Sequence, residues 1–422
     1  MGRRGHSSGA PTKGLRFLLA GFGARGDVVP LFALARALTE RGHDVRVAAP
    51  PDFEAEARER GVAFSPVGTP VRSLFQGRSL KPHQRLSRAR EEIGLHFRAL
   101  APLAKDVQLV VGTAGEVAAA SVAEASGAGF VHLSLSPQAL PSANHPPPYV
   151  PWPSLPALLS RVSWGSVGVL LNTLGRSMLN DERRRLGLAG VSDVLGHLLP
   201  RRALMAVDPV LGPLPGDLAQ TVLQCGAIFD ETDTSLSADV EAFLSAGAPP
   251  VFFGFGSMTD AHVAQTTSTL LSAARARGQR AIFERGWGGL GEGAHGDDVL
   301  VLDRVSHAAL LPRVASVVHH GAPGMVALAA RAGVPQVVIP HLLDQPYWGS
   351  RVKALGVGPA PLPKARLEPR RLGQALKVAA SPAVIAAARE LAPRIVRDGL
   401  ACAVDRIERL AARPCEALVP AV

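Results

Sequence analysis

The seven residues from His319 to Met325, with the sequence HHGAPGM, constrain the fold of this chain more than any other segment. They follow the apolar run Val314–Val318 and open the alanine-rich segment Val326–Ala332. A strand that ends in small residues and turns into a helix presents free backbone N–H groups and a positive helix end, which suit a diphosphate. The segment therefore predicts a phosphate site. The alternative is an ordinary strand-to-helix turn, because short glycine motifs recur by chance.

Strand and helix patterns alternate through the first half of the chain. The apolar run Arg16–Phe22 is a predicted strand, and it leads through a glycine turn at Gly23–Asp27 into a helix that stops near Gly42. Weaker signals continue the alternation as far as the predicted strand Phe130–Leu135. Such a series is typical of βαβ units with a parallel sheet.

A second series of the same kind follows an irregular middle. Prolines interrupt residues 137–202, apart from a predicted helix around Leu174. Strands and helices then alternate again from Val251–Phe255, and a helical tail over Pro369–Ala412 is expected to break at Pro393. The two series predict an α/β fold of two Rossmann-like doubly wound domains.

The length of 422 residues suits about two to three domains. Glycine, proline and acidic residues interrupt both patterns between the two series, which is typical of a joint between domains. The predicted organisation is a disordered N-terminal arm over residues 1–14, a first domain over 15–212, an interdomain linker over 213–245 and a second domain with C-terminal helices over 246–422.

Composition narrows the class of protein and its compartment. No apolar run approaches the roughly 20 residues of a membrane span, and the basic arm has no apolar segment typical of a secretory signal. The three cysteines, Cys225, Cys402 and Cys415, are too few and scattered for a disulfide framework or a zinc site. We therefore expect a globular protein of the cytoplasm, without a metal or a cofactor.

The net charge of +10 restricts the possible partners. Four tryptophans and two tyrosines provide few platforms on which bases could stack, so nucleic-acid binding is not expected. A weak association with an anionic membrane surface remains open, because arginines are spread through several predicted helices.

Asp27 is the candidate catalytic residue. It lies where the first predicted strand meets the first helix, and ligands bind at the carboxyl ends of parallel strands in open α/β sheets. A carboxylate there can act as a general base on a hydroxyl, or it can merely satisfy backbone donors in the first helical turn. The neighbouring Arg25 can lower the pKa of Asp27 or contact a phosphate.

Two further segments end predicted strands in the second half. Ser257 closes the first of these strands in the sequence GFGS, where it faces a ligand or caps the next helix. Asp344 and Gln345 open a helix after another strand, where they cap that helix or hold sugar hydroxyls. The absence of a D-x-D motif argues against a metal-dependent nucleotide-sugar site, and hydrolase, P-loop and zinc-protease motifs are missing too.

Five blocks in the same order resemble the antibiotic and sterol branch of the family 1 glycosyltransferases, above all the enzymes that act on vancomycin-type aglycones and the sterol and glycolipid transferases. The first block, FGARGDVVP from Phe22 to Pro30, is similar to the family's GSRGDVxP. The block VVHHGAPGM is similar to VVHHGGAGT, and the block DQPYWGSRV from Asp344 to Val352 follows DQPxWxxRV. The remaining blocks are VFFGFGSM from Val251 and ERGW from Glu284, and the resemblance spans about Arg16 to Ala412.

This resemblance implies a GT-B fold and an inverting, metal-independent hexosyltransferase. The donor would be a UDP- or dTDP-linked hexose or deoxyhexose, and the acceptor a hydroxyl of a large apolar molecule, such as a natural-product aglycone in antibiotic biosynthesis, a sterol or a glycolipid. Asp27 matches the family's base. The donor contacts are expected at Ser257, Val305, His320, Gly321, Gly324, Met325, Asp344 and Gln345.

The phosphate turn departs from the family pattern. Pro323 removes a backbone N–H, and Met325 stands where the family has a hydroxyl. Two lost phosphate contacts of about 1–3 kcal/mol each would weaken donor binding by about one to four orders of magnitude. Arg25 and Arg285 are candidates to hold the donor instead. The alternative function is a catalytically weak or inactive scaffold that acts as a binding or regulatory partner.

The acceptor is expected to enter at the proline-rich region Ser136–Pro156. Its apolar side chains, including Leu140, Tyr149 and Trp152, are candidates to line the mouth of the acceptor site. A loop that merely covers the domain is the alternative interpretation.

Overall fold

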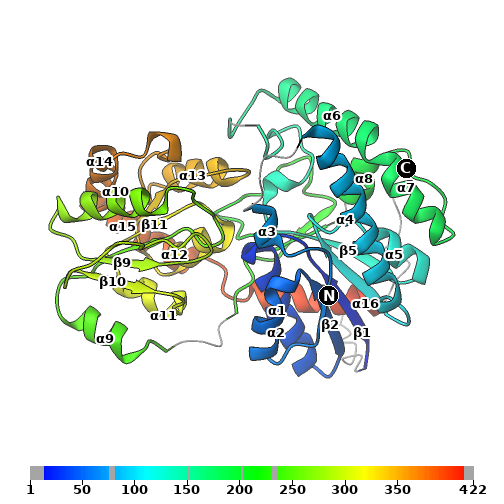
Figure 1. Ribbon diagram of the computed structural model, residues 1–422, viewed down its shortest axis with the longest axis horizontal. Helices are drawn as coiled ribbons and strands as arrows, with labels where there is room; N and C mark the ends of the chain where they lie inside the picture. Colours follow the sequence, from blue (N-terminus) through cyan, green and yellow to red (C-terminus); the bar gives the residue numbers. More distant parts are fainter. Residues whose placement is uncertain (1–13, 76–80, 151, 201–202, 231–234, 413–422) are drawn as a thin grey trace, which may run out of the picture.

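The computed structural model describes residues 14–75, 81–150, 152–200, 203–230 and 235–412. Within them the chain forms two α/β domains that lie side by side (Figure 1). This confirms the predicted fold class. The predicted disordered arm lies outside the described residues, apart from Gly14.

The N-terminal domain is built on a seven-stranded parallel sheet with the order β3-β2-β1-β4-β5-β6-β7. In chain order the strands are β1 (Arg16–Ala20), β2 (Asp44–Ala49), β3 (Phe64–Pro66), β4 (Leu109–Thr113), β5 (Gly129–Ser134), β6 (Ala203–Met205) and β7 (Val222–Gln224). Its helices are α1 (Arg25–Glu40), α2 (Glu54–Glu59), α3 (Val71–Phe75), α4 (Pro82–Leu103), α5 (Ala119–Ser126), α6 (Ala157–Leu174), α7 (Arg176–Arg185) and α8 (Val194–Leu198).

The C-terminal domain has a five-stranded parallel sheet with the order β10-β9-β8-β11-β12. Its strands are β8 (Val251–Gly254), β9 (Ala281–Glu284), β10 (Val299–Leu302), β11 (Ser316–His319) and β12 (Gln336–Val338). The helices of this half are α9 (Ala238–Ser245), α10 (Val263–Arg275), α11 (His307–Leu310), α12 (Pro323–Arg331), α13 (Gln345–Ala354), α14 (Pro369–Ala379), α15 (Pro382–Leu391) and α16 (Gly399–Ala412).

Helices cover both faces of each sheet, as the continuous apolar runs of the strands require. In the N-terminal domain one face packs against α1 and α16, and the other against α4, α5 and α7. In the C-terminal domain α10 and α14 cover one face, while α9, α11 and α12 cover the other. Both sheets therefore lie inside apolar layers, which leaves the strand ends and their loops to carry polar function.

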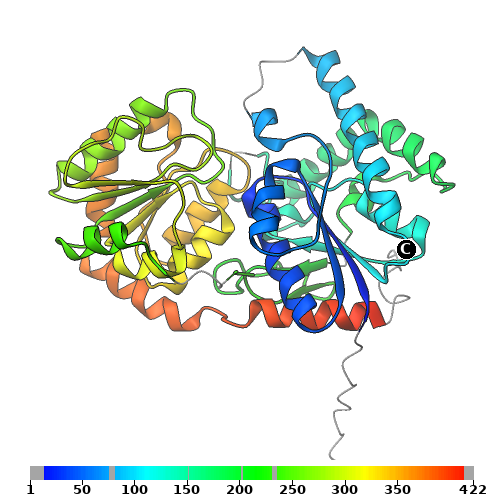
Figure 2. The same cartoon turned by 60° about the horizontal axis from the view of Figure 1, so that its bottom comes forward.

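Two predicted domain boundaries are wrong. The predicted linker over residues 213–245 contains β7, which pairs with β6 as the edge strand of the first sheet, so that sheet extends beyond residue 212. The second domain does not keep the whole tail either. Ala403, Val404 and Ile407 of α16 are buried in the core of the N-terminal domain. Figure 2 shows α16, in red, running along that domain. The apolar face of α16 finds its partner on α1, which the local sequence pattern does not reveal.

The predicted break at Pro393 is confirmed. The tail forms α14 and α15, then a short 3₁₀ helix at Ala392–Arg394, and only afterwards α16. Proline has no N–H to continue the helical hydrogen bonds, so the chain can change direction there and return to the first domain. No helix of the described residues is long and apolar enough to span a membrane.

The two domains share an apolar core as well as the returning tail. Met205, Val207 and Leu211 of the first domain pack in one cluster with Val326 and Trp348 of the second. The Arg351 side chain adds hydrogen bonds to the carbonyls of Val210 and Leu211. These contacts hold the carboxyl ends of β1 and β12 near the same boundary.

Candidate active site

The turn from β1 to α1 presents Asp27 at the domain boundary. Gly23 has a φ of +150°, and a Cβ at that position would collide with Oδ2 of Asp27, so only glycine fits beside the carboxylate. Oδ2 accepts a hydrogen bond of 2.9 Å from the Ala24 N–H. Asp27 therefore does satisfy a backbone donor of the first turn, but that bond uses only one of its two oxygens.

Asp27 is half-buried and has no ion-pair partner among the described residues, and its pKa is strongly perturbed. Burial raises the pKa of Asp27 from 3.8 to about 7, against the opposing effect of the Ala24 N–H, and the charge of Asp344 adds to the rise. A carboxylate with a pKa near neutrality suits a general base, because near pH 7 part of it is deprotonated and it can hold the proton that it accepts.

Asp344 approaches Asp27 from the second domain. Its Oδ2 accepts a hydrogen bond of 2.8 Å from the Trp348 indole N–H, and its side chain makes no capping bond to α13. The capping interpretation of Asp344 is therefore wrong. Burial raises the pKa of Asp344, while Ser136 and Trp348 oppose the shift. The boundary thus brings together two carboxylates, and the charge of Asp344 disfavours a charge on Asp27.

Gln345 and Ser257 fix loops at the same boundary. Oε1 of Gln345 accepts from the N–H groups of His341 and Leu342, at 2.7 and 3.0 Å, so this amide orders the turn that leads into α13. Oγ of the buried Ser257 accepts from the Arg25 N–H at 3.3 Å, which joins the second domain to the first turn of α1. Ser257 caps no helix, since α10 begins only at Val263.

The predicted phosphate turn connects β11 to α12. Gly321 has a φ of +97°, and a Cβ there would crowd Val338. Pro323 takes the first helical position, where its missing N–H is best tolerated, so the N–H groups of Gly324 and Met325 lead the helix. A Cβ at Gly324 would meet open space, which leaves room in front of this turn.

Two histidines lie behind this turn. Burial lowers the pKa of His320 to about 3, and its Nδ1 has no partner among the described residues. Burial also lowers the pKa of His341 to about 4, and its Nε2 likewise has no partner there. Their rings lie 6.4 Å apart. Neutral rings with unpartnered buried nitrogens suit a polar ligand that enters between the domains.

Three predicted donor residues lie away from the turn or point elsewhere. Met325 packs against the apolar cluster beneath α12, and Val305 packs against the same cluster. The Arg285 side chain pairs with Asp303 at 3.0 Å and is about half exposed. These side chains are held by the protein itself, so any contribution to donor binding would come from their backbones or after rearrangement.

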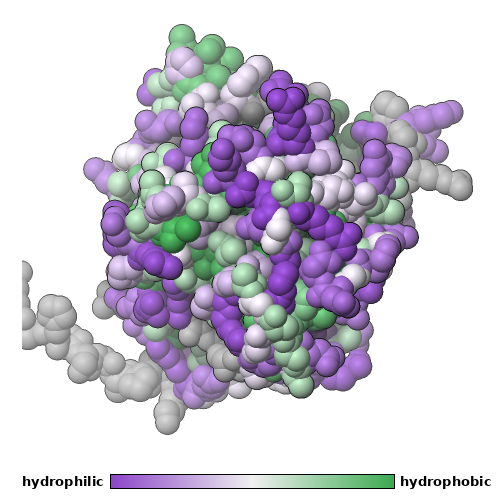
Figure 3. Space-filling model, turned by 90° about the vertical axis from the view of Figure 1, so that its left-hand side faces the viewer, coloured by the Kyte–Doolittle hydropathy of each residue, from purple (hydrophilic) through white to green (hydrophobic). Residues whose placement is uncertain are grey.

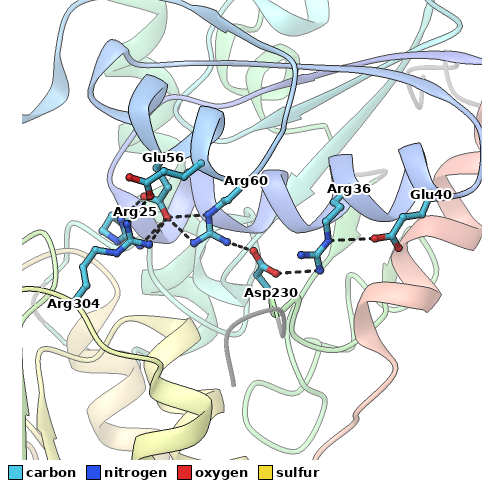
Figure 4. Close-up of polar contacts among 8 residues, drawn as sticks. Arg25, Arg36, Glu40, Glu56, Arg60, Asp230 and Arg304 are labelled. Carbon is cyan, nitrogen blue, oxygen red and sulfur yellow. Dashed lines mark hydrogen bonds and ion pairs between the residues drawn. The ribbon is translucent and has the colours of Figure 1, made fainter. Parts of the chain in front are cut away.

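Arg25 does not contact Asp27 through its side chain but pairs with Glu56. Figure 4 shows a chain of ion pairs that runs from Arg304 of the second domain through Glu56, Arg60 and Asp230 to Arg36. Although burial raises the pKa of Glu56, Arg25 and Arg60 outweigh that effect and keep it below its ordinary value. The Arg25 side chain is therefore paired with Glu56, and its charge is not among the effects that shift the pKa of Asp27.

The predicted acceptor residues separate into two kinds. Leu140 is only 1% exposed and packs in the core shared by the domains, so its predicted place at the acceptor mouth is wrong. Tyr149 and Trp152 are 73% and 62% exposed, which leaves both rings available to an apolar ligand.

Sequence reasoning missed three residues of the site: His341, Ser136 and Glu56. His341 directly follows the end of β12 and its proline, a position after a parallel strand that offered a usable signal. Ser136 and Glu56 act through contacts with Asp344 and Arg25, which lie far away in sequence and gave no local signal.

Comparisons with known proteins agree with this geometry. Residues 17–133 match the glycosyltransferase family 28 N-terminal domain, and residues 291–403 match the C-terminal domain of erythromycin biosynthesis protein CIII-like proteins. The chain is 37% identical to the vancomycin aglycone glucosyltransferase of Amycolatopsis orientalis, over 92% of this chain and 96% of that protein. It is 31% identical to the sterol 3-beta-glucosyltransferase UGT80B1 of Arabidopsis thaliana, over 94% of this chain and 68% of that protein.

Among solved structures, the glycosyltransferase VinC in complex with dTDP superposes with a TM-score of 0.65 at 20% identity, over 94% of this chain and 100% of VinC. The two parallel-sheet domains that lie side by side give the chain the GT-B fold of these structural neighbours. The chain belongs to the family 1 glycosyltransferases, in the branch that holds the vancomycin-type aglycone and sterol enzymes. The resemblance seen in its sequence motifs is thereby confirmed.

We predict that Asp27→Asn lowers turnover by about 10²–10⁴-fold, because the amide keeps the bond from Ala24 but cannot accept a proton. The same change should raise the melting temperature above pH 7. Because the pKa of Asp27 is raised in the folded protein, the stability that its protonation contributes is fully present below about pH 4. That stability is lost as the pH rises through about 7. Steady-state rates and thermal unfolding from pH 5 to 9 test both effects. Near-normal turnover would rule out Asp27 as the base.

We predict that Asp344→Asn moves the acidic limb of the pH–kcat/KM profile below that of the unmodified enzyme. The amide oxygen can still accept from Trp348, but the charge that raises the pKa of Asp27 is gone. Asp298→Asn, which removes a carboxylate from an ion pair with Arg275, is the matched control and should leave the limb in place. An unmoved limb in Asp344→Asn would show that the two carboxylates are not coupled.

Proposed function

We propose that the protein transfers a hexose or deoxyhexose from a UDP- or dTDP-linked sugar to a hydroxyl of a large apolar acceptor, with inversion and without a metal. Asp27 takes the proton of the acceptor hydroxyl as its oxygen bonds to the anomeric carbon. The bond from that carbon to the diphosphate breaks, and the nucleoside diphosphate leaves with the electron pair. The transfer is then balanced without another reactant.

The observation that carries this proposal is the pKa of Asp27. A half-buried carboxylate with no cationic partner among the described residues stays basic enough to remove a proton, which a surface aspartate with a pKa near 4 does poorly. Glu56 supports that state because it holds the Arg25 side chain in an ion pair of its own. His132 is an alternative base, but burial lowers its pKa to about 4.

The donor is proposed to lie along the second domain. The N–H groups of Gly324 and Met325 at the start of α12, together with His320 and Gly321, suit the diphosphate. The dTDP complex of VinC supports a nucleotide in the shared fold. Asp344 is proposed to accept from sugar hydroxyls, since its position beside Asp27 brings the sugar within reach of the base.

The acceptor is proposed to meet the first domain near Tyr149 and Trp152. The names of the relatives include an aglycone and a sterol enzyme, which favours a large apolar acceptor with a hydroxyl. Exposed aromatic rings offer such a ligand contact area at low entropic cost.

One observation favours the second candidate, a catalytically silent member of the family. Pro323 and the inward packing of Met325 leave the diphosphate two fewer protein donors than the related sequence motif supplies. The fold tolerates both changes, so the chain would keep this fold even if it had lost the ability to bind the donor.

We predict that UDP or dTDP raises the melting temperature of the unmodified protein at about millimolar concentration, where a ligand at 100 times its Kd stabilises by about 2.7 kcal/mol. The triple variant Ala322→Gly/Pro323→Ala/Met325→Thr should bind the same nucleotide about ten- to 10⁴-fold more tightly, because it restores one N–H and one hydroxyl. Isothermal titration of both proteins measures this difference.

The matched control is Ala332→Gly, a change at the far end of α12 that should leave nucleotide affinity unchanged. Nucleotide binding that appears only in the triple variant would establish the silent scaffold. Binding by neither protein would contradict the proposed donor site altogether.

A further inference from the structure

Helix α6 carries an apolar face that no described part of the protein covers. Its exposed aliphatic side chains are Leu158, Leu159, Val162, Val169, Leu170 and Leu174, which are 43–71% exposed. Successive residues of a helix are about 100° apart, so these six share one side, together with the small Ser166 and Thr173. Arg161 is the sole charged residue in the 18 residues of this helix.

The opposite side of α6 shows that the helix is firmly docked. Trp164 is buried and its indole N–H donates to the carbonyl of His145 at 3.0 Å, while Oδ1 of Asn172 accepts from the Val194 N–H at 2.9 Å. The helix is therefore docked by its buried side through both packing and hydrogen bonds, while its exposed side is apolar. An ordinary surface helix instead presents polar residues to the solvent.

The surroundings of α6 combine aromatic and basic side chains. The loop that leads into the helix exposes Tyr149 and Trp152, the ring types that favour the interface of a bilayer. Arg161 and Arg176 are exposed and have no carboxylate partner among the described residues. Figure 1 places α6 along the upper edge of the molecule, and Figure 3 shows a cluster of apolar residues at that height, above a face on which hydrophilic and apolar residues are mixed.

A lipid surface fits this face better than a second copy of the chain. A stable dimer buries about 20–30 residues on each side, whereas six helical residues and two aromatic rings make up this face. The unpaired arginines beside it complement anionic headgroups, and the chain as a whole carries a net charge of +10. An exposed apolar stripe rimmed by arginines is typical of helices that lie in the bilayer interface.

We propose that α6 docks the protein on an anionic lipid bilayer, with its aliphatic face among the acyl chains and Arg161 and Arg176 at the headgroups. The site is distinct from the donor and base machinery. The role of this docking rests on the proposed function. Docking on a bilayer favours an acceptor that resides in a membrane or enters the enzyme from one.

Flotation with vesicles of phosphatidylglycerol and phosphatidylcholine tests this docking. The full-length protein should float with these vesicles, and less with pure phosphatidylcholine or at high salt. Val169→Glu should weaken the binding by about tenfold or more, since it places a carboxylate on the docking face. Arg161→Gln should weaken binding to the anionic vesicles by about fivefold. Val378→Glu, an exposed valine on α14 of the other domain, is the matched control and should bind normally.

Two further measurements keep the outcomes separate. Turnover of a water-soluble acceptor without vesicles should be equal in Val169→Glu and the unmodified enzyme, so a failure of the proposed function would appear there and not in flotation. Unchanged flotation of Val169→Glu, or no flotation of the unmodified protein, overturns the proposal. Light scattering that shows a dimer converted to a monomer by Val169→Glu also overturns it, in favour of a second copy of the chain on this face. A raised KM of Val169→Glu for the soluble acceptor overturns it in favour of acceptor binding on this face.

Discussion

The site depends on a half-buried carboxylate that has no ion-pair partner among the described residues. Asp27 gains one backbone hydrogen bond from Ala24 and faces the second carboxylate of Asp344, so its charged form is disfavoured in the folded protein. The rest of the protein must supply the stability that this arrangement removes. It does so with two fully layered sheets, an apolar core shared by the domains and a C-terminal helix that returns to the first domain.

The domain boundary brings the two carboxylates together in one site. Because the apolar cluster around Trp348 holds α13 against the first domain, Asp344 is brought to Asp27 from a segment more than 300 residues away in the chain. The ion pairs from Arg304 to Asp230 tie α2 to the second domain and engage the side chain of Arg25, which stands two residues before Asp27 in the chain. The contacts that pack the two domains together therefore also place the residues of the proposed catalytic site.

The sequence predicts most of the fold and the centre of the site, because both follow from local patterns. Alternating apolar runs mark the strands, and Gly23 with Asp27 stands where a parallel strand ends. What it misses depends on distant contacts. Strand β7 is only three residues long, and α16 finds its core in another domain. The burial of Leu140 and the pairing of Glu56 with Arg25 also arise from segments that meet only in the folded chain.

The most direct test of this account is the titration of Asp27 itself. Carboxyl ¹³C NMR of aspartate-labelled protein, with the resonance of Asp27 assigned by its loss in the Asp27→Asn variant, measures its pKa without reference to turnover. The account predicts an apparent pKa of about 7, the value to which burial raises it. A pKa near 4, the ordinary value for an aspartate, would contradict the central claim that the fold holds this carboxylate ready to accept a proton.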